Sequence, residues 1–252
     1  MSKTTDDLKR FHIFSIFPPM LSGPMDHSII RRAMDKELID IKIHDVREHT
    51  NNKHKKVDDY QYGGGAGMVM KPEPIFDAVE SVQKLYNSEV RAEMPVILLS
   101  PQGRTFNQNI AKEFSKKPGL LLICGRYEGV DERIRTHLAT DDISIGDYVL
   151  SGGELAAMVV LDSVARLVPG VVGSESSICT DSFANGMLQH PVYTRPDKFR
   201  GWPVPRVLLS GDHGSVEKWR NEQAEARTRN WRPDLLSNEE HFIERGGSFK
   251  RV

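Results

Sequence analysis

The segments PVILLS (95–100) and LLLIC (120–124) decide the fold of this chain. Each is a short and continuous apolar run, which is typical of a strand at the centre of a parallel sheet that is covered on both faces. The segment between them, NQNIAKEFSKK (107–117), can form a helix. Two buried parallel strands joined by a helix predict an α/β fold.

The segments on either side extend this pattern. FHIFSIF (11–17) is apolar and β-prone until Pro18-Pro19 interrupts it, and IDIKIHDV (39–46) reads as a strand with alternating faces. DDISIGDYVLS (141–151) supplies another strand and a turn. The apolar spacing predicts helices over residues 26–38, 74–86 and 152–170. The last of these is apolar on nearly all sides, as expected for a helix that packs on two faces.

The character of the chain changes after Gly170. VVGSESSICTDSFANG (171–186) is rich in serine and glycine and has no apolar period, which indicates a flexible linker. Beyond it, SVEKWRNEQAEARTRNW (215–231) and SNEEHFIER (237–245) have the pattern of helices. We therefore expect an α/β domain over 1–170, a linker over 171–186 and a small helical domain over 187–252.

Charge and cysteine content limit the classes of function. The 252 residues include 34 Lys and Arg against 35 Asp and Glu, a net charge of -1, so any nucleic-acid site must be a local patch. Cys124 and Cys179 form no CxxC pair, and the nine histidines do not cluster at metal-ligand spacing, so we expect no metal site of these types. The polar N-terminus is unlike a secretory signal, and no apolar run approaches membrane-spanning length. We expect a cytoplasmic protein without a membrane partner.

Three predicted strands run into turns that contain glycine: SPQG (100–103), GRYEG (125–129) and GDYVLSGG (146–153). Ligands of open α/β sheets bind at the carboxyl ends of the strands, and glycine lets the backbone approach them closely. Any one of these turns is explained equally well as an ordinary tight turn. Three at one end of a sheet favour a nucleotide-like ligand.

The usual nucleotide fingerprints are missing. In GGGAGM (63–68) the sixth position of GxGxxG is Met68, and no GxxxxGK[ST] occurs, which weakens a dinucleotide or ATP interpretation. An adenosyl ligand without a pyrophosphate remains open, and S-adenosylmethionine is one. Adenine needs an apolar slot and backbone hydrogen bonds, for which the candidates are Leu98, Leu99, Ile145, Tyr148 and Leu150.

Five strings carry a resemblance to a known family. KHKKVDDYQYGGGAGMVMKPEP, LLSPQGRTFNQ, CGRYEGVDERI, ISIGDYVLSGGELAAMVVLDSVARLVPGVVG and DSFANGMLQHPVYTRP follow one another in the order found in the bacterial tRNA (guanine-N1) methyltransferases. Together they cover most of residues 11–230, which makes the resemblance highly specific. It implies a knotted (trefoil) parallel-sheet methyltransferase domain of the SPOUT superfamily and a C-terminal tRNA-binding domain. It also implies a homodimer with its active site at the subunit interface.

The resemblance also implies the activity and the cofactor site. The expected reaction is S-adenosylmethionine-dependent methylation of guanine N1, at the guanosine immediately 3′ of the tRNA anticodon. Leu98 departs from the family, which often has an aromatic residue there, and this puts one purine-packing contact in doubt. The cofactor-binding residues implied are Leu99, Ser100, Pro101, Gln102, Gly125, Tyr127, Glu128, Ser144, Ile145, Gly146, Asp147, Tyr148, Val149, Leu150, Gly152 and Gly153.

Arg166 and Asp181 match the catalytic pair of the family. Guanine N1 carries a proton at neutral pH, so a carboxylate such as Asp181 can remove that proton as N1 attacks the methyl group. The negative charge that appears on O6 is stabilised by a guanidinium, here Arg166. Without the resemblance, an N-cap is the favoured role of Asp181, which can also serve both roles, and an ion pair with Asp162 is a strong alternative for Arg166.

Alternatives remain open for Glu128 and for the basic residues near the C-terminal end of the chain. Glu128 orients a ligand amine, binds Mg²⁺ or is merely an exposed turn carboxylate. The candidate RNA-binding residues are interleaved with Trp219 and Trp231, which suits phosphate pairing and stacking, but an ordinary charged helix with two buried tryptophans explains the same pattern. These candidates are Lys218, Arg220, Arg227, Arg229 and Arg232.

Three other functions compete with this one. A knotted methyltransferase could act on another RNA, but the GGGAGM and DSF segments argue against it. A non-catalytic RNA-binding module is disfavoured by the intact Arg166, Asp181 and glycine loops. A doubly wound enzyme using a different nucleotide is disfavoured by the missing fingerprints.

Overall fold

The computed structural model describes residues 8–173 and 180–236. The chain divides into two compact units, residues 1–173 and residues 174–252, and each is described by itself. Residues 174–179 of the expected linker and the expected helix over 237–245 lie outside the described residues.

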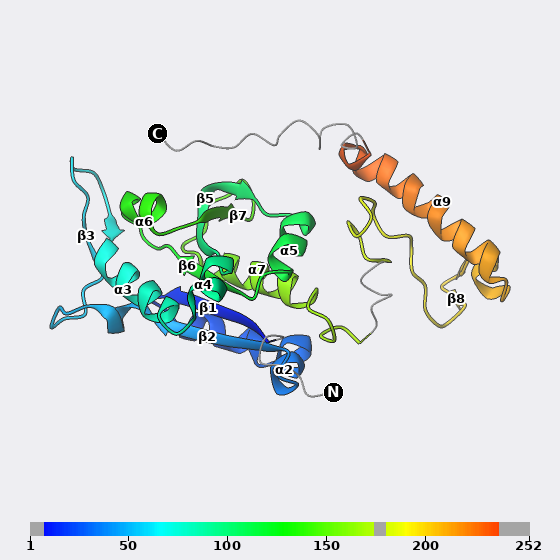
Figure 1. The fold of residues 1–252 in the computed structure, drawn as a ribbon. Helices are drawn as coiled ribbons and strands as arrows, with labels where there is room; N and C mark the ends of the chain where they lie inside the picture. The colour runs from blue at the N-terminus through cyan, green and yellow to red at the C-terminus, as the bar shows by residue number, and fades with distance from the viewer. Residues whose placement is uncertain (1–7, 174–179, 237–252) are drawn as a thin grey trace. The chain divides into compact units, whose positions relative to one another are not determined.

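A parallel sheet of five strands forms the centre of the first unit (Figure 1). Its strand order is β2-β1-β6-β5-β7, and every neighbouring pair is parallel. The two apolar runs are the neighbouring strands β5 and β6, which confirms the predicted α/β class. The strands are β1 (Lys9–Ser15), β2 (Ile39–Asp45), β5 (Val96–Thr105), β6 (Gly119–Cys124) and β7 (Asp141–Ser144).

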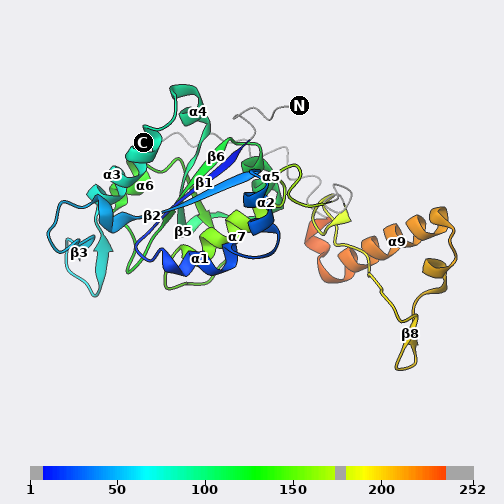
Figure 2. The ribbon, with the colours of Figure 1, turned by 90° about the horizontal axis from the view of Figure 1, so that it is seen from below.

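Helices cover both faces of this sheet, as Figure 2 shows. Alternate residues of a strand point to opposite faces, so Leu120 and Leu122 of β6 lie in one apolar core, while Leu121 and Ile123 lie in the other. The first core is closed by α1 (Pro19–Met25), α2 (Ser28–Asp35), α5 (Gln108–Ser115) and α7 (Glu154–Ala165). The second is closed by α3 (Pro72–Gln83) and α6 (Glu132–His137), and α4 (Ser88–Glu93) precedes β5.

The helix α1 was not predicted. The sequence analysis took Pro18-Pro19 only as an interruption after the first strand, yet α1 starts at Pro19. Proline is well tolerated in the first turn of a helix because the backbone N–H there has no helical partner. The predicted helix over 26–38 is the shorter α2, and the predicted strand over 141–151 is β7 only to Ser144, followed by a loop.

A small antiparallel hairpin, also not predicted, carries the glycine cluster between β3 (Asp58–Tyr60) and β4 (Met68–Met70). Gly63, Gly64, Gly65 and Gly67 all have positive φ, a conformation that side chains disfavour.

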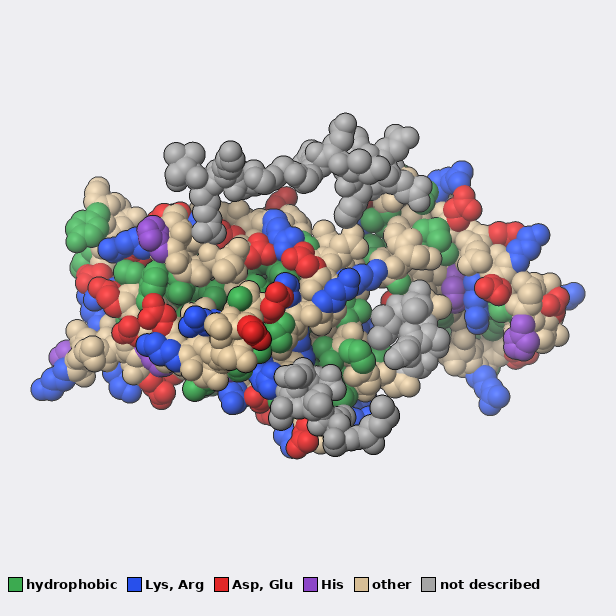
Figure 3. All heavy atoms as spheres, viewed as in Figure 1, with side chains coloured by type: hydrophobic (Ala, Val, Ile, Leu, Met, Phe, Trp, Pro, Cys, Tyr) green, Lys and Arg blue, Asp and Glu red, His purple; other side chains and the backbone are tan. Residues whose placement is uncertain are grey.

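Charged side chains of both signs are interspersed on the face shown in Figure 3, without a large patch of one sign among the described residues.

The second unit contains the helix α9 (His213–Trp231), which confirms the helix predicted over 215–231. Asp212 caps its N-terminus, where the carboxylate accepts hydrogen bonds from the backbone N–H groups of Gly214 and Ser215. The short strands β8 (Lys198–Phe199) and β9 (Trp202–Pro203) form a hairpin. The 3₁₀ turns Arg206–Leu209 and Pro233–Leu235 flank α9 in the chain.

Candidate active site

A cavity of about 300 Å³ lies in the first unit, where the loops after β6 and β7 meet the outer part of β5. The predicted site residues that line it come from all three segments. All the predicted cofactor residues except Asp147 belong to its wall, and Leu98 joins them. The structure therefore brings together side chains that are up to about fifty positions apart in the sequence, while their part in binding remains a prediction.

The first segment of the wall is an irregularity in β5. Leu99 and Arg104 both pair with Ile143 of β7, so the four residues between them, Ser100 to Gly103, leave the ladder. Glycine is needed at 103 because a Cβ there would stand 2.4 Å from the carbonyl carbon of Asp142. The Ser100 hydroxyl accepts a hydrogen bond from the Gln102 N–H at 3.2 Å, which stabilises the bulge.

The second and third segments interlock through glycine. Gly153 N donates to the carbonyl of Gly125 at 2.9 Å, which ties the loop after β7 to the loop after β6. A Cβ on Gly153 would stand 2.7 Å from the Cα of Cys124, so no larger residue fits this contact without movement. Tyr127 has a φ of 61°, a left-handed conformation that is uncommon for a non-glycine residue and turns the chain sharply after β6.

The apolar part of the wall lies beside the loop after β7. Leu98, Leu99, Ile145 and Leu150 all line the cavity. The Tyr148 hydroxyl donates to the carbonyl of Ile145 at 3.2 Å, which folds this loop back on itself. An apolar wall of this kind can pack against the ring of a purine, and the adjacent loop backbone can form hydrogen bonds with its polar edge.

A buried ion pair that the sequence analysis missed supports the wall. Arg126 Nε donates to Glu154 at 2.9 Å, and the Ser15 hydroxyl donates to the other carboxylate oxygen at 2.6 Å. The Glu154 side chain is 1% exposed, and Arg126 lines the cavity while its Nη1 donates to the carbonyl of Ser151 at 3.1 Å. The one sequence signal was a glutamate at the start of an otherwise apolar helix.

A second missed arginine, Arg135 of α6, also lines the cavity. Its guanidinium hydrogen-bonds the carboxylate of Asp142 on β7 and donates to the Ser100 hydroxyl at 3.1 Å. Arg135 thus joins α6, β7 and the bulge of β5, three elements that the sequence does not place together.

The two residues predicted to be catalytic lie in different units. Arg166 is the C-cap of α7, and its backbone N–H donates to the carbonyl of Asp162 at 3.2 Å. Asp181 lies in the second unit, where its carbonyl accepts from Ala184 N at 3.1 Å. Their catalytic roles remain predictions.

The predicted RNA-binding residues lie on α9 or at its end, and two of them are ion-paired. Arg229 pairs with Glu225 at 2.5 Å, and Arg232 pairs with Asp234 at 2.7 Å. Arg227 stacks over the ring of Trp231 at 5.0 Å. Trp231 is 65% exposed, so the alternative of an ordinary helix with two buried tryptophans is wrong for this residue.

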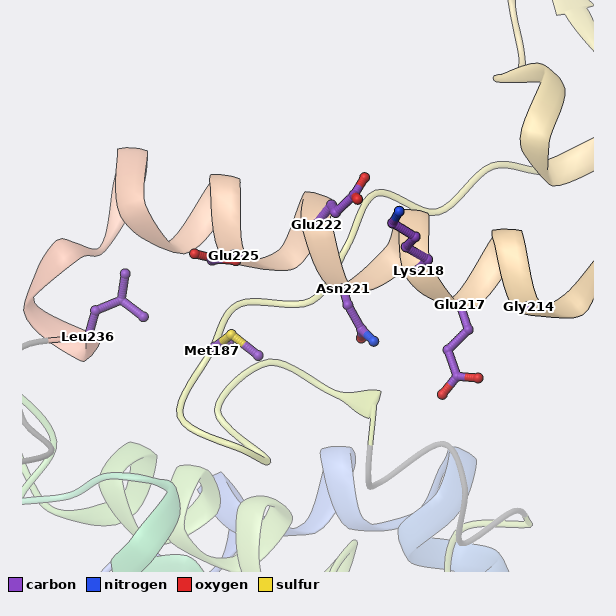
Figure 4. Close-up of a pocket in the computed structure, with 8 residues that line it drawn as sticks. All are labelled: Met187, Gly214, Glu217, Lys218, Asn221, Glu222, Glu225 and Leu236. Atoms are coloured by element: carbon purple, nitrogen blue, oxygen red, sulfur yellow. The ribbon is translucent and has the colours of Figure 1, made fainter.

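A hollow of about 630 Å³ lies along α9 on the side that carries Lys218 (Figure 4). Glu217, Glu222 and Glu225 line it together with Lys218, so carboxylates outnumber ammonium groups there. Such a surface repels phosphate, which argues against Lys218 as an RNA contact and favours the predicted arginines, none of which lines the hollow.

Two properties follow from the described residues alone. Over 8–173 and 180–236, no group of three or more His, Cys, Asp or Glu side chains is arranged to hold a metal ion. Within the same ranges, no helix has both the length and the apolar character needed to cross a membrane.

Comparison with known proteins identifies the family. The profile of the family described as tRNA (Guanine-1)-methyltransferase TrmD matches residues 9–238. The chain is 54% identical to a tRNA (guanine-N(1)-)-methyltransferase of Dehalococcoides mccartyi over 227 residues, 90% of each chain. The protein of the same name in Halalkalibacterium halodurans is 53% identical over 227 residues, which are 90% of this chain and 91% of that protein. The one in Listeria monocytogenes is 52% identical over 229 residues, which are 91% of this chain and 92% of that protein. The chain belongs to the tRNA (guanine-1)-methyltransferase family, which confirms the resemblance.

Proposed function

We propose that this enzyme transfers the methyl group of S-adenosylmethionine to N1 of the guanosine immediately 3′ of the tRNA anticodon. The observation that carries the proposal is the cavity at the ends of β5, β6 and β7 in a chain of this family. Its glycine contacts at 103 and 153 fix three loops around one space. Because its proposed substrate is tRNA, we also propose that the enzyme acts in the cytoplasm.

The cavity fits an adenosyl cofactor on its own chemistry. Leu98, Leu99, Ile145 and Leu150 supply the apolar slot, and the backbone of the loop after β7 supplies hydrogen-bonding groups for the purine edge. Tyr127 and Glu128 line the same space and offer polar groups to the amino-acid end of the cofactor. When bound there, S-adenosylmethionine provides the electrophilic methyl group.

Arg166 and Asp181 act on the guanine. The Asp181 carboxylate accepts the N1 proton, which turns a weak nucleophile into a reactive one. The electron pair released by that proton loss spreads to O6, and the Arg166 guanidinium stabilises the charge there. Asp181→Ala will abolish methyl transfer and leave cofactor affinity nearly unchanged, because Asp181 is not part of the cavity wall.

We also propose that Mg²⁺ binds at the cavity together with the RNA substrate. Mg²⁺ is commonly held by one or two carboxylates together with phosphates and waters of the substrate. Glu128, at the cavity, is the carboxylate we assign to it. Titrating Mg²⁺ against methylation by Glu128→Gln and by the unaltered enzyme tests the assignment, which fails if both show the same dependence.

The enzyme acts as a homodimer in which each active site combines the cavity of one subunit with Asp181 of the other. α7 supports this arrangement, since Leu155 and Val159, one turn apart, are 50% and 44% exposed on a helix whose other faces are buried. Mixing Asp181→Ala with Gly146→Trp, which fills the cavity, will restore about a quarter of the activity although each variant alone is inactive. Inactive heterodimers of folded chains would disprove the shared site.

The decisive experiment uses labelled cofactor. Purified enzyme is incubated with labelled S-adenosylmethionine and a tRNA transcript that has guanosine 3′ of the anticodon, and the product is digested to nucleosides. Label in N1-methylguanosine, absent when that guanosine is replaced by adenosine, is the expected result. Label in another nucleoside, or no label in the transcript, would overturn the proposal.

A further inference from the structure

The hairpin of β8 and β9 projects from the rest of the second unit, as Figure 2 shows. Its turn residues Arg200 and Gly201 have φ values of 51° and 91°. Two consecutive positive φ values produce the tight turn that matches the twist of paired strands. The turn brings Phe199 directly opposite Trp202 in the ladder, so both rings lie on the same face.

This face is aromatic and open to solvent. Phe199 is 55% exposed and Trp202 is 68% exposed, with ring centroids 6.3 Å apart and planes inclined by 53°. The guanidinium of Arg200 lies 5.2 Å from the Phe199 centroid, so a planar cation adjoins the two rings. We call Phe199, Arg200 and Trp202 the hairpin platform.

The charge around the hairpin platform differs from that of the whole chain. From 193 to 211 the basic side chains outnumber the acidic ones, although the chain as a whole carries a net charge of -1. Asp197 is the one acidic residue in this segment. All of these charged side chains are exposed. The basic residues are Arg195, Lys198, Arg200 and Arg206.

We propose that the hairpin platform binds an unpaired segment of the tRNA substrate by stacking one of its bases on Trp202, an inference that rests on the proposed function. Aromatic rings bordered by arginine bind single-stranded nucleic acid in this way, since each base offers a flat face and each phosphate a negative charge. A paired base within a helix has no free face, so the platform selects a loop or a bulge. Stacking adds an attraction that does not depend on salt to the charge attraction of α9.

The first test is affinity at several salt concentrations. Trp202→Leu keeps the apolar contact across the hairpin and removes the ring, while Trp202→Phe keeps a ring. Trp202→Leu will weaken binding of a tRNA transcript about five- to 150-fold, the range for loss of one stacked base. The slope of affinity against salt will not change, because no charge is lost. Arg220→Ala, by contrast, will lower the slope by about one.

Two controls separate stacking from damage to the fold. Leu209→Ala removes another exposed apolar side chain of this unit, 60% exposed and without a ring, and will leave affinity unchanged. Trp202→Phe will recover most of the affinity that Trp202→Leu loses. Equal losses in Trp202→Phe and Trp202→Leu, or no loss in either, would overturn the proposal.

A spectroscopic test reports stacking directly. With Trp219 and Trp231 replaced by phenylalanine, Trp202 is the last tryptophan of the chain. Its fluorescence will be quenched by the tRNA transcript and by a single-stranded oligonucleotide but not by a fully paired RNA duplex. Equal quenching by the duplex contradicts the proposal.

The partner could instead be a second copy of the chain, and sedimentation decides this. Trp202→Leu will leave the oligomeric state unchanged, whereas dissociation of the variant would overturn the proposal by assigning the platform to a subunit contact. The proposed function is judged separately, by whether the unaltered enzyme methylates the transcript. If it does and the variants bind equally well, the platform inference alone fails.

Discussion

Replacing Glu154 with glutamine removes the buried charge that supports the cavity wall. The carboxylate accepts hydrogen bonds from Ser15 at 2.6 Å and Arg126 at 2.9 Å, and the amide that replaces it has nearly the same shape. The substitution therefore tests the charge rather than the packing. We expect a less stable first unit and weaker binding of S-adenosylmethionine.

The expected magnitude follows from burial. Removing one member of a buried ion pair costs about 3–5 kcal/mol, because the remaining charge stays out of water without compensation. Arg126 is 12% exposed and also bonds the Ser151 carbonyl, which places the loss near the lower end, about 3 kcal/mol. Ser15→Ala removes the hydrogen bond to the Glu154 carboxylate, which costs about 1.5–3 kcal/mol, and also the bond that the Ser15 hydroxyl accepts from Phe17 N at 2.8 Å.

The assay must report the first unit. Tryptophans occur only at 202, 219 and 231, in the second unit, so tryptophan fluorescence does not follow unfolding of the first. Hydrogen exchange of the buried α7 amides, followed by mass spectrometry against denaturant, measures the relevant free energy. Calorimetric titration with S-adenosylmethionine gives the cofactor affinity of the same preparations.

A double substitution provides the check on the argument. Arg126→Leu combined with Glu154→Leu removes both charges and will be more stable than Glu154→Gln alone, because no buried charge is left unpaired. A loss below about 1 kcal/mol in Glu154→Gln, or a double variant no more stable than the single one, would show that the buried charge of Glu154 does not stabilise the first unit.

Three further predictions follow from the described contacts. Gly153→Ala will weaken cofactor binding, measured by calorimetry, at least about tenfold, because the new Cβ would stand 2.7 Å from the Cα of Cys124. Gly173→Ala, at a position with open space around it, is the control and will leave the affinity unchanged. Burial, and secondly the charge of the neighbouring His44, lowers the pKa of His12 from 6.5 to about 4. Between these two pH values the imidazole is protonated in the unfolded chain but neutral in the folded one. The free energy of unfolding therefore falls as the pH drops from 6.5 to 4. Hydrogen exchange of the first unit will show a flatter pH dependence in His12→Asn, and an unchanged dependence would contradict the assignment. Affinity for tRNA will fall steeply with salt, and Arg220→Ala will flatten that slope, whereas a salt-independent affinity excludes a phosphate patch on α9.

The features that depend on a local pattern are predictable from the amino-acid sequence alone. The apolar runs of β5 and β6 predicted buried parallel strands, because a strand covered on both faces has no polar side. The positions of Gly103, Gly125 and Gly153 after three strands predicted one shared site, since the carboxyl ends of parallel strands meet at one edge. The family strings then predicted the reaction and the roles of Arg166 and Asp181 as its catalytic pair.

How residues that are distant in the sequence meet depends instead on the tertiary structure. Ser15 lies more than one hundred positions before Arg126 and Glu154, which are themselves 28 positions apart. The three meet because β1 and β6 are neighbours in the order β2-β1-β6-β5-β7. The bulge at Ser100 exists because β5 pairs with β7 on both sides of it. The local spacing of apolar residues predicts neither the strand order nor the pairing register. Both depend on which of several apolar surfaces bury one another best. That is why the sequence located the cavity wall but not the ion pair that supports it.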